Sequence, residues 1–188
     1  MDWRVDGWLS NVEVRPSPNF GERPEGEKIS LLVIHNISLP PEQFGGHWVE
    51  RFFLNDLDPF AHPYFATISN FQVSAHFYLR RDGRIVQFVG CDKRAWHAGQ
   101  SACDGRENCN DYSIGIELEG SDTQPFSAIQ YEALWFLIDR IRERYPISTI
   151  RGHSDIAPGR KTDPGPYFEW CAVRCRYPEL DLPIEVAA

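Results

Sequence analysis

The sequence lacks the apolar segments that would place it in a membrane. None of its 188 residues belong to an apolar stretch as long as a membrane span, and the N-terminal segment has no basic region followed by an apolar run. We therefore expect no signal peptide and no contact with a membrane. We also expect the protein to be cytoplasmic.

Positive charge is also scarce. The chain has 19 Lys and Arg against 27 Asp and Glu, which gives a formal net charge of −8, and it has no Lys/Arg-rich arm or stripe. Binding to nucleic acid depends on clustered positive charge, so we expect no nucleic-acid partner. A few converging Arg and Lys side chains can still bind an anionic ligand on an acidic protein.

Cysteine is present but forms no recognisable motif. The five cysteines are odd in number and include no Cys-x-x-Cys pair. Reduced thiols in a cytoplasmic protein are the simplest interpretation. Cys171 and Cys175 stand one helical turn apart, so pairing or metal binding stays open for them beside a structural role.

Apolar residues are plentiful enough for a packed core. Hydrophobic residues make up 42% of the chain and aromatic residues 13%, including six Trp. The length suits one domain of ordinary size, and no repeat or linker divides it. We expect a single domain over residues 1–188, and a monomer. Aromatic side chains either fill the core or line a groove for sugars or peptides, and composition alone favours the core.

Strand patterns recur along the chain. Segment 29–36 is apolar almost throughout, which is typical of a strand buried on both faces. Asp82 and Gly83 stand between two further strand patterns and predict a hairpin. The predicted strands are residues 29–36, 73–80, 85–89, 113–119 and 148–151.

Helix patterns lie between these strands. Ser127 and Gln130 form a capping box at the start of the clearest helix, and Pro146 follows its end. The mixture of strands and helices predicts an α/β (α+β) fold, with a single mixed sheet covered by helices. Further helices are predicted at 42–54 and 167–174, loops at 58–70 and 99–112, and a loosely held tail from 178.

Histidine offers chemistry, but its spacing selects no site. Six histidines occur, and none form His-x-x-x-His. Position is more informative: His35 ends the most apolar strand, where ligands gather in α/β sheets, and His153 begins a loop that contains Lys161 and Asp163. Each has an ordinary alternative, because strand-end histidines are usually structural and loop charges are usually solvated.

Glu117 is a second indication of a site. In segment 113–119 apolar residues alternate with Gly115, Glu117 and Glu119, so these three share the face opposite the core. A carboxylate there must be exposed in a cleft, paired or bound to something, and a simple salt bridge is the alternative. Gly115 would leave room for a metal and a substrate.

Six segments carry a resemblance to a known family: LLVIHNISLPP, HPYF, VSAHF, RAWHAG, CNDYSIGIELEG and GHSDIAPGRKTDPGP. Together they resemble the zinc amidases that cut the bond between N-acetylmuramic acid and L-alanine. This family also includes the peptidoglycan recognition proteins. The resemblance extends over roughly residues 7–170 and is specific, because several motifs occur together.

The resemblance implies the fold of the peptidoglycan recognition proteins and one Zn²⁺ ion per chain. It assigns the zinc ligands to His35, His153 and Asp163, and catalysis to Glu117 and Lys161. The chemistry agrees with these roles, because a catalytic zinc site keeps a position for water and lowers the pKa of that water towards about 7. Glu117 would pass the proton of the water to the leaving amine, and Lys161 would stabilise the oxyanion.

The resemblance also implies substrate-binding residues. Asn36, Tyr64, Trp96 and His97 match positions near the site, with core packing as an equal alternative for Trp96. Peptide carboxylates of the substrate need nearby cations, and Arg106 is a candidate, with a plain surface position as its alternative. The remaining histidines, which we expect to be structural or adjacent to ligands, are His47, His62 and His76.

Two functions follow from the resemblance. The first is hydrolysis of the amide bond between (1,6-anhydro-)N-acetylmuramic acid and L-alanine in muropeptides during cytoplasmic cell-wall recycling, which in related systems keeps inducible β-lactamase expression low. The alternative is a non-catalytic module that binds peptidoglycan fragments. Non-catalytic relatives lose zinc ligands, so the presence of all five implied residues favours the enzyme.

Overall fold

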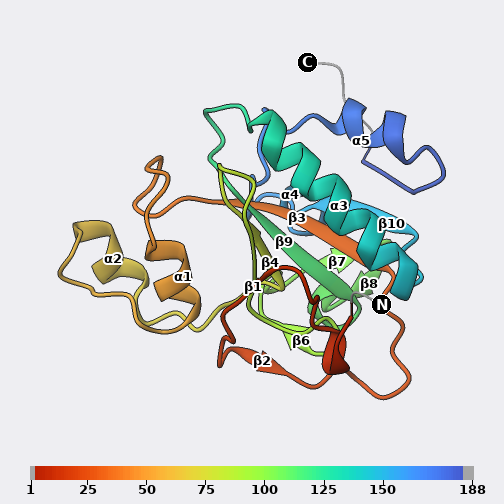
Figure 1. Ribbon diagram of the computed structural model, residues 1–188, viewed down its shortest axis with the longest axis horizontal. Coiled ribbons are helices and arrows are strands. Elements are labelled where there is room, and N and C mark those ends of the chain that lie inside the picture. Colours follow the sequence, from red (N-terminus) through yellow and green to blue (C-terminus); the bar gives the residue numbers. More distant parts are fainter. Residues whose placement is uncertain (1–2, 184–188) are drawn as a thin grey trace.

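A mixed β-sheet forms the centre of the computed structural model, which describes residues 3–183 (Figure 1). Its strands are β1 (Glu13–Val14), β3 (Leu31–Ile37), β4 (Phe77–Leu79), β5 (Ile85–Gln87), β9 (Ser113–Glu119) and β10 (Thr149–Gly152). They lie in the order β1-β5-β4-β9-β3-β10. β4 and β5 are antiparallel, and each other neighbouring pair is parallel. The long parallel strands β3 and β9 therefore end at the same edge of the sheet.

One face of the sheet is covered by α3 (Ala128–Arg144), which runs along it in Figure 1. Ile34 of β3 and Ile116 of β9 belong to the same buried cluster as Leu137 of the helix. Ser127 caps the start of the helix. Its hydroxyl accepts a hydrogen bond from the Gln130 backbone N–H at 3.3 Å, and the Gln130 side-chain oxygen accepts one from the Ser127 backbone N–H at 3.0 Å. The predicted capping box is confirmed.

The opposite face of the sheet has a different cover. Tyr78 of β4 and Val86 of β5 pack there against apolar side chains of α1 (Trp48–Phe53). α1 lies with α2 (Pro63–Ile68) at one side of the sheet, on the left of Figure 1. Farther along this face, Val33 of β3 packs against Ala98 and Tyr112 of the long connection between β5 and β9. His35 and Glu117 project on this face, because they alternate with the residues that face α3.

The remaining elements are short. They are η1 (Val5–Gly7), β2 (Phe20–Gly21), β6 (Arg94–Ala95), β7 (Ala102–Cys103), β8 (Arg106–Glu107), η2 (Cys109–Asp111), α4 (His153–Ile156) and α5 (Trp170–Arg176). β2 pairs with β6, and β7 with β8, both antiparallel. The predicted fold, a single mixed sheet covered by helices, is confirmed, as are its five predicted strands, although the observed strands at 77–79 and 85–87 are shorter than predicted.

Two predictions between residues 42 and 70 were wrong. The helix predicted at 42–54 covers only Trp48–Phe53, because Glu42 and Gly45 adopt positive φ angles and form a loop. The loop predicted at 58–70 contains α2. Proline is favoured in the first turn of a helix, and Pro63 takes that position while the His62 ring accepts the Tyr64 amide at 3.2 Å. His62 thus has the structural role expected of it.

Two further predictions were wrong in the second half of the chain. The loop predicted at 99–112 contains the β7–β8 hairpin, which turns at Asp104 and Gly105, both with positive φ. This Asp-Gly pair is the same hairpin signal as at residues 82–83. The tail from 178, predicted to be loosely held, is packed against the domain up to residue 183. Leu180 is buried, and the backbone of Asp181 forms hydrogen bonds with Ser148 and Ile150 at β10. Residues 184–188 lie outside the described residues. The last helix begins three residues later than the predicted 167.

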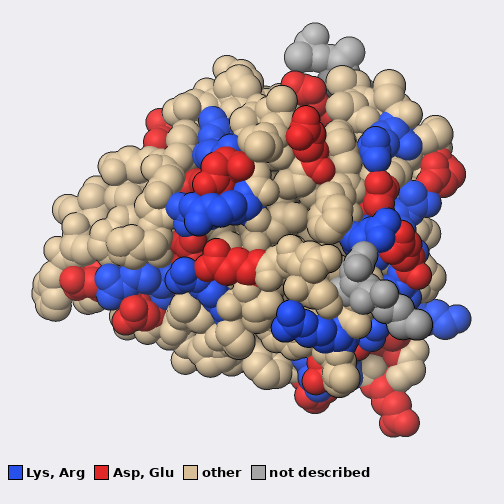
Figure 2. Space-filling view, in the orientation of Figure 1, with Lys and Arg blue, Asp and Glu red and all other residues tan. Residues whose placement is uncertain are grey.

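The surface mixes charges of both signs. Figure 2 shows basic and acidic side chains interspersed on one face, with no continuous band of either sign. Within residues 3–183, no helix is both long and apolar enough to cross a bilayer. The five cysteines are free thiols, and Cys171 and Cys175 are exposed on α5.

Candidate active site

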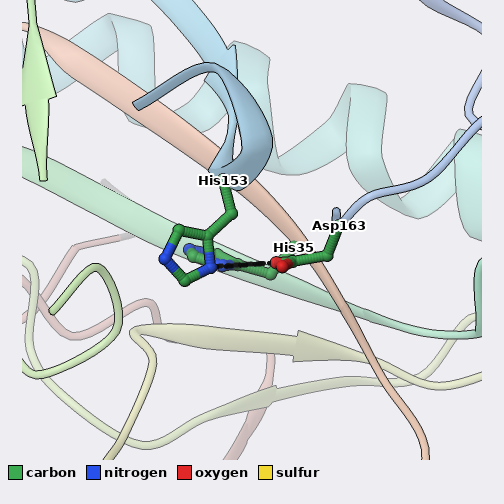
Figure 3. A group of neighbouring side chains, drawn as sticks. All are labelled: His35, His153 and Asp163. Atoms are coloured by element: carbon green, nitrogen blue, oxygen red, sulfur yellow. Dashed lines mark hydrogen bonds and ion pairs between the residues drawn. The ribbon is translucent and has the colours of Figure 1, made fainter. Parts of the chain in front are cut away.

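Two histidines and an aspartate converge at the carboxyl edge of the sheet (Figure 3). His35 lies near the end of β3, His153 is the first residue of α4 directly after β10, and Asp163 comes from the following loop. His35 Nδ1, His153 Nδ1 and Asp163 Oδ2 are each 3.0 Å from the other two. The structure therefore brings together the three predicted zinc ligands.

Parallel pairing explains how these distant residues meet. Arg151 of the parallel strand β10 pairs with Val33 of β3. His153 and His35, two residues farther on in each case, therefore lie at the same edge of the sheet. The loop that carries Asp163 is then tied down, because the Asp163 carbonyl accepts the Ser154 amide at 2.9 Å. Asn36, next to the ligand on β3, donates to the Pro164 carbonyl at 3.0 Å and fixes the loop from the other side.

The surroundings of His153 determine its tautomer. Its Nε2 lies 3.1 Å from the Ala98 carbonyl, which can only accept, so this nitrogen carries the proton. Nδ1 is therefore the nitrogen that faces His35 and Asp163, and in the neutral ring it offers a lone pair to a metal. The ring is buried, and the Arg160 guanidinium donates to the same carbonyl at 2.7 Å, which holds the arrangement in place.

The electrostatics favour neutral imidazole beside an ionised carboxylate. Burial lowers the pKa of His35 to about 4, although the hydrogen bond with Asp163 acts in the opposite direction. Burial acts to raise the pKa of Asp163, but the contacts with the His153 and His35 rings, which stabilise the carboxylate when these rings carry a proton on Nδ1, outweigh burial, so the pKa lies below its ordinary value. These are the protonation states that metal ligands need.

The three residues fit a zinc ion. Two imidazole nitrogens and one carboxylate oxygen form a donor set that is typical of catalytic zinc sites. Ligand atoms about 2.0–2.2 Å from a tetrahedral zinc ion stand about 3.3–3.6 Å apart. The observed separations of 3.0 Å are close to this edge length. An ion of this size would fit between the three atoms with little change in side-chain position.

Glu117 lies beside this group. It pairs with His35 across the parallel strands β9 and β3, so the two side chains are neighbours on the sheet. Glu117 is buried, and its Oε2 has no hydrogen-bond partner among the described residues. Burial raises its pKa well above the ordinary value, the charge of Asp163 adds to this effect, and Lys161 opposes it. A carboxyl group with a raised pKa is suited to exchanging a proton near neutral pH.

A cleft of about 600 Å³ opens over these residues. Its lining includes Glu117, Lys161 and both His153 and Asp163, and it extends past Asp122 on one side. Four of the predicted substrate-binding residues also line it: Asn36, Tyr64, Trp96 and His97. Both apolar and polar side chains face the cleft, as is usual for a site that binds a small ligand.

Arg106 is not brought to the cleft. It lies on β8, forms an ion pair with Glu27, and stacks 3.8 Å above the centre of the Tyr112 ring. It does not line the cleft, and the position agrees with its surface alternative. Gly115 also differs from expectation: a Cβ there would lie 2.4 Å from Cγ of His97. The space is filled by this ring, and it is not left for metal or substrate.

Sequence reasoning missed the groups that hold the site together. Asp122 accepts the Asn36 amide at 2.7 Å from 86 positions along the chain, and the Ala98 carbonyl holds His153. Neither has a sequence signal, because one depends on a distant segment and the other on a backbone atom. His76 has the expected structural role, since its Nδ1 accepts the Gly115 amide at 3.0 Å and its Nε2 lies 3.1 Å from the Lys93 carbonyl.

Close relatives of this chain are known amidases. The chain is 54% identical over 171 residues to the 1,6-anhydro-N-acetylmuramyl-L-alanine amidase AmpD of Citrobacter freundii, and the alignment covers 90% of this chain and 91% of that protein. A crystal structure of a selenomethionine AmpD derivative, with 53% identity, superimposes with a TM-score of 0.89 over 93% of this chain and 98% of that chain.

More distant structures share the fold. AmiD from E. coli, solved with the substrate anhydro-N-acetylmuramic acid-L-Ala-D-gamma-Glu-L-Lys, is 31% identical with a TM-score of 0.61, covering 88% of this chain and 63% of that chain. Drosophila PGRP-LB, at 19% identity, has a TM-score of 0.60 over 88% of this chain and 90% of that chain, which confirms the predicted fold class. A sequence profile described as N-acetylmuramoyl-L-alanine amidase matches residues 25–166. This chain belongs to the N-acetylmuramoyl-L-alanine amidase family.

Proposed function

We propose that the protein is a zinc-dependent amidase that hydrolyses the bond between 1,6-anhydro-N-acetylmuramic acid and L-alanine in muropeptides. The observation that carries the proposal is the convergence of His35, His153 and Asp163 beside Glu117 in one cleft. We propose one Zn²⁺ per chain, held by these two histidines and the aspartate. When bound, the ion supplies a Lewis acid that makes water acidic and polarises a carbonyl group.

Glu117 is proposed to move the proton. Glu117 lines the cleft, so its carboxylate group is within reach of a water molecule that attacks the amide carbonyl of a bound substrate. The carboxylate accepts a proton from this water and then donates it to the leaving nitrogen of L-alanine. The raised pKa supports this role, because the carboxylate accepts the proton of the water readily and retains it until the leaving nitrogen takes it up.

Lys161 is proposed to stabilise negative charge. It comes from the loop that also carries Asp163, and it lines the cleft with Glu117. Its charge is close enough to affect the pKa of both Glu117 and His35. An ammonium group at this place favours the oxyanion that forms when the carbonyl carbon becomes tetrahedral.

The substrate class is supported by two relatives. AmpD of Citrobacter freundii is a 1,6-anhydro-N-acetylmuramyl-L-alanine amidase, and AmiD was solved with an anhydro-N-acetylmuramic acid peptide. We propose that Asn36, Tyr64, Trp96 and His97 contact such a fragment, because all four line the cleft. Tyr64 is 40% exposed, so its ring is available to a sugar or a peptide. Arg106 stays a prediction for a carboxylate contact.

The cellular setting is also proposed. A single domain over residues 1–188, a monomeric state and a cytoplasmic location agree with the recycling role that the family resemblance implies. Removal of anhydromuramyl peptides keeps inducible β-lactamase expression low in related systems, and we propose the same effect here. No nucleic-acid or membrane partner is proposed.

Product identification tests the proposal. Purified protein is incubated with an anhydromuramyl tripeptide after treatment with a chelator, with and without added Zn²⁺, and the products are read by mass spectrometry. We expect free tripeptide and anhydro-N-acetylmuramic acid only with zinc. His153→Ala should release neither, because one of the three ligands is lost.

The non-catalytic binding module is the competing function. It predicts that the same tripeptide binds to the zinc-loaded protein, measured by calorimetry, but stays intact. Binding without cleavage would replace the enzyme proposal, whereas cleavage at the bond to L-alanine excludes the module.

A further inference from the structure

The outer nitrogens of both ligand histidines contact one short segment, His97 and Ala98. His35 Nε2 lies 2.9 Å from His97 Nδ1, and His153 Nε2 lies 3.1 Å from the Ala98 carbonyl. Neither contact belongs to the three-residue metal group itself. The segment therefore touches the back of both imidazole rings whose front faces Asp163.

This segment is held in place by a buried amide. The Asn110 side chain accepts the backbone amides of His97 at 3.2 Å and Ala98 at 2.8 Å through a single oxygen. Asn110 is buried in η2. A fixed backbone keeps the Ala98 carbonyl and the His97 ring at constant positions relative to the sheet.

The His97 ring packs directly against Gly115 of β9. Its atoms occupy the place where Gly115 would carry a Cβ, with Cγ only 2.4 Å from that position. Its Nε2 lies 3.1 Å from the hydroxyl of Ser113, which is fully buried. Both ring nitrogens of His97 are thus engaged, one by His35 and the other by Ser113.

Two directions of hydrogen bonding are compatible with these distances. In the first, the Ser113 hydroxyl donates to His97, His97 Nδ1–H donates to His35, and the proton on His35 Nδ1 faces Asp163. In the second, His35 Nε2–H donates to His97 Nδ1 and His97 Nε2–H donates to Ser113. Only the second leaves the His35 Nδ1 lone pair free for a metal.

We propose that His97 is a positioning residue that holds His35 in its metal-binding tautomer, with Ser113 as the final acceptor. Ala98 does the same for His153 through its carbonyl. This inference rests on the proposed zinc site, and it gives His97 a role through His35 in addition to its place in the cleft wall. Groups that orient metal-bound histidines typically contribute 10- to 100-fold to metal affinity or activity.

Zinc affinity is the decisive measurement. Zinc-free wild-type protein and variants are titrated with Zn²⁺ in competition with a chromophoric chelator, and circular dichroism establishes that each variant is folded. His97→Phe keeps a ring but removes both nitrogens, and we expect zinc binding to weaken by about 10- to 100-fold. His97→Asn places an amide oxygen near the former Nδ1, and we expect it to restore most of the loss.

His47 provides a matched control. It is exposed at the start of α1 and does not line the cleft, so His47→Phe removes a histidine without changing the site. We expect its zinc affinity to equal that of the wild type. Equal affinity in His97→Phe would overturn the inference, while the proposed function would stand if the wild type binds zinc and cleaves.

A second readout needs no variant. In zinc-loaded wild-type protein, long-range ¹⁵N–¹H NMR should place the His97 proton on Nε2. A proton on Nδ1 would overturn the inference, because His97 could not then accept from His35. Wild-type protein that binds no zinc at all would overturn the proposed function and this inference with it.

Discussion

The two faces of β9 make opposite demands on neighbouring residues. Ile114 and Ile116 point toward α3 and are completely buried among apolar side chains. Ser113, Gly115 and Glu117 point the other way, and each is also buried, but against histidine rings or the cleft. Burial is therefore not what separates the two faces. On the α3 face, the buried atoms require only close packing. On the opposite face, the buried nitrogen and oxygen atoms must also be in the correct protonation state.

This difference predicts different consequences of substitution. On the α3 face, a lost methyl group costs packing and hydrogen bonds are unaffected. On the opposite face, a lost nitrogen or oxygen leaves its partner unsatisfied or in the wrong protonation state. Substitutions on the α3 face should mainly lower stability. Substitutions on the opposite face should mainly weaken metal binding or turnover.

The largest effect is expected at Glu117. Glu117→Gln keeps the shape of the side chain and removes its ability to accept a proton, so kcat should fall by about 10²- to 10⁴-fold. Zinc content should be unchanged and the thermal midpoint unchanged or higher, because a buried carboxyl group is replaced by a neutral amide. Steady-state kinetics and metal analysis of the same preparation test this. A variant with nearly full kcat would remove Glu117 from the mechanism.

Ile116, one position earlier, provides the matched contrast. Ile116→Ala should destabilise the protein by about 2–5 kcal/mol, because the side chain is fully buried in the core. At a temperature where the variant is still folded, kcat should stay within a few-fold of the wild type. Urea unfolding and kinetics are the measurements. A loss of kcat comparable with that of Glu117→Gln would contradict the division between the faces.

Gly115 tests whether the polar face depends on space as well as protons. The Cβ of Gly115→Ala would overlap the His97 ring, so the ring must shift. We expect a stability loss of about 1–3 kcal/mol and zinc affinity lower by about 10-fold. Chelator competition measures the second effect. Unchanged zinc affinity would mean that the position of the ring is not critical.

The smallest effect is expected at Asn36. Asn36→Ala removes the hydrogen bonds to Asp122 and to the Pro164 carbonyl, each contributing about 0.5–1.5 kcal/mol. Because these bonds hold the loop with Asp163, zinc affinity should weaken by a few-fold, and KM should rise modestly because Asn36 also lines the cleft. A large rise in KM with unchanged zinc affinity would instead make Asn36 mainly a substrate contact.

The sequence was sufficient for much of the fold. The apolar run of β3 and the alternation of β9 reflect burial that is visible residue by residue, and the capping box of α3 is a local contact. Short elements were harder to predict. The helix α2, for example, has only six residues, and its start depends on a cap from the His62 side chain. The β7–β8 hairpin carried a turn signal at Asp104 and Gly105, which the polar composition of its surroundings obscured.

The site was predictable only in part, because many of its contacts join residues that are far apart in the sequence. Residue types and strand ends pointed to His35, His153 and Glu117, and the family resemblance supplied Lys161 and Asp163. The contacts that orient them join segments far apart, as between His35 and His97, 62 positions away. Such contacts have no local pattern. The structure was needed to see that Gly115 makes room for a ring.

We expect one metal ion, bound by His35, His153 and Asp163, to make the cleft catalytic. The most direct test is to titrate zinc-free protein with Zn²⁺ and to measure the rate of anhydromuramyl tripeptide cleavage at each addition. We expect a rate near zero without metal that rises to a plateau at one zinc ion per chain. Full activity in the zinc-free protein, or a rate that zinc does not restore, would contradict this expectation.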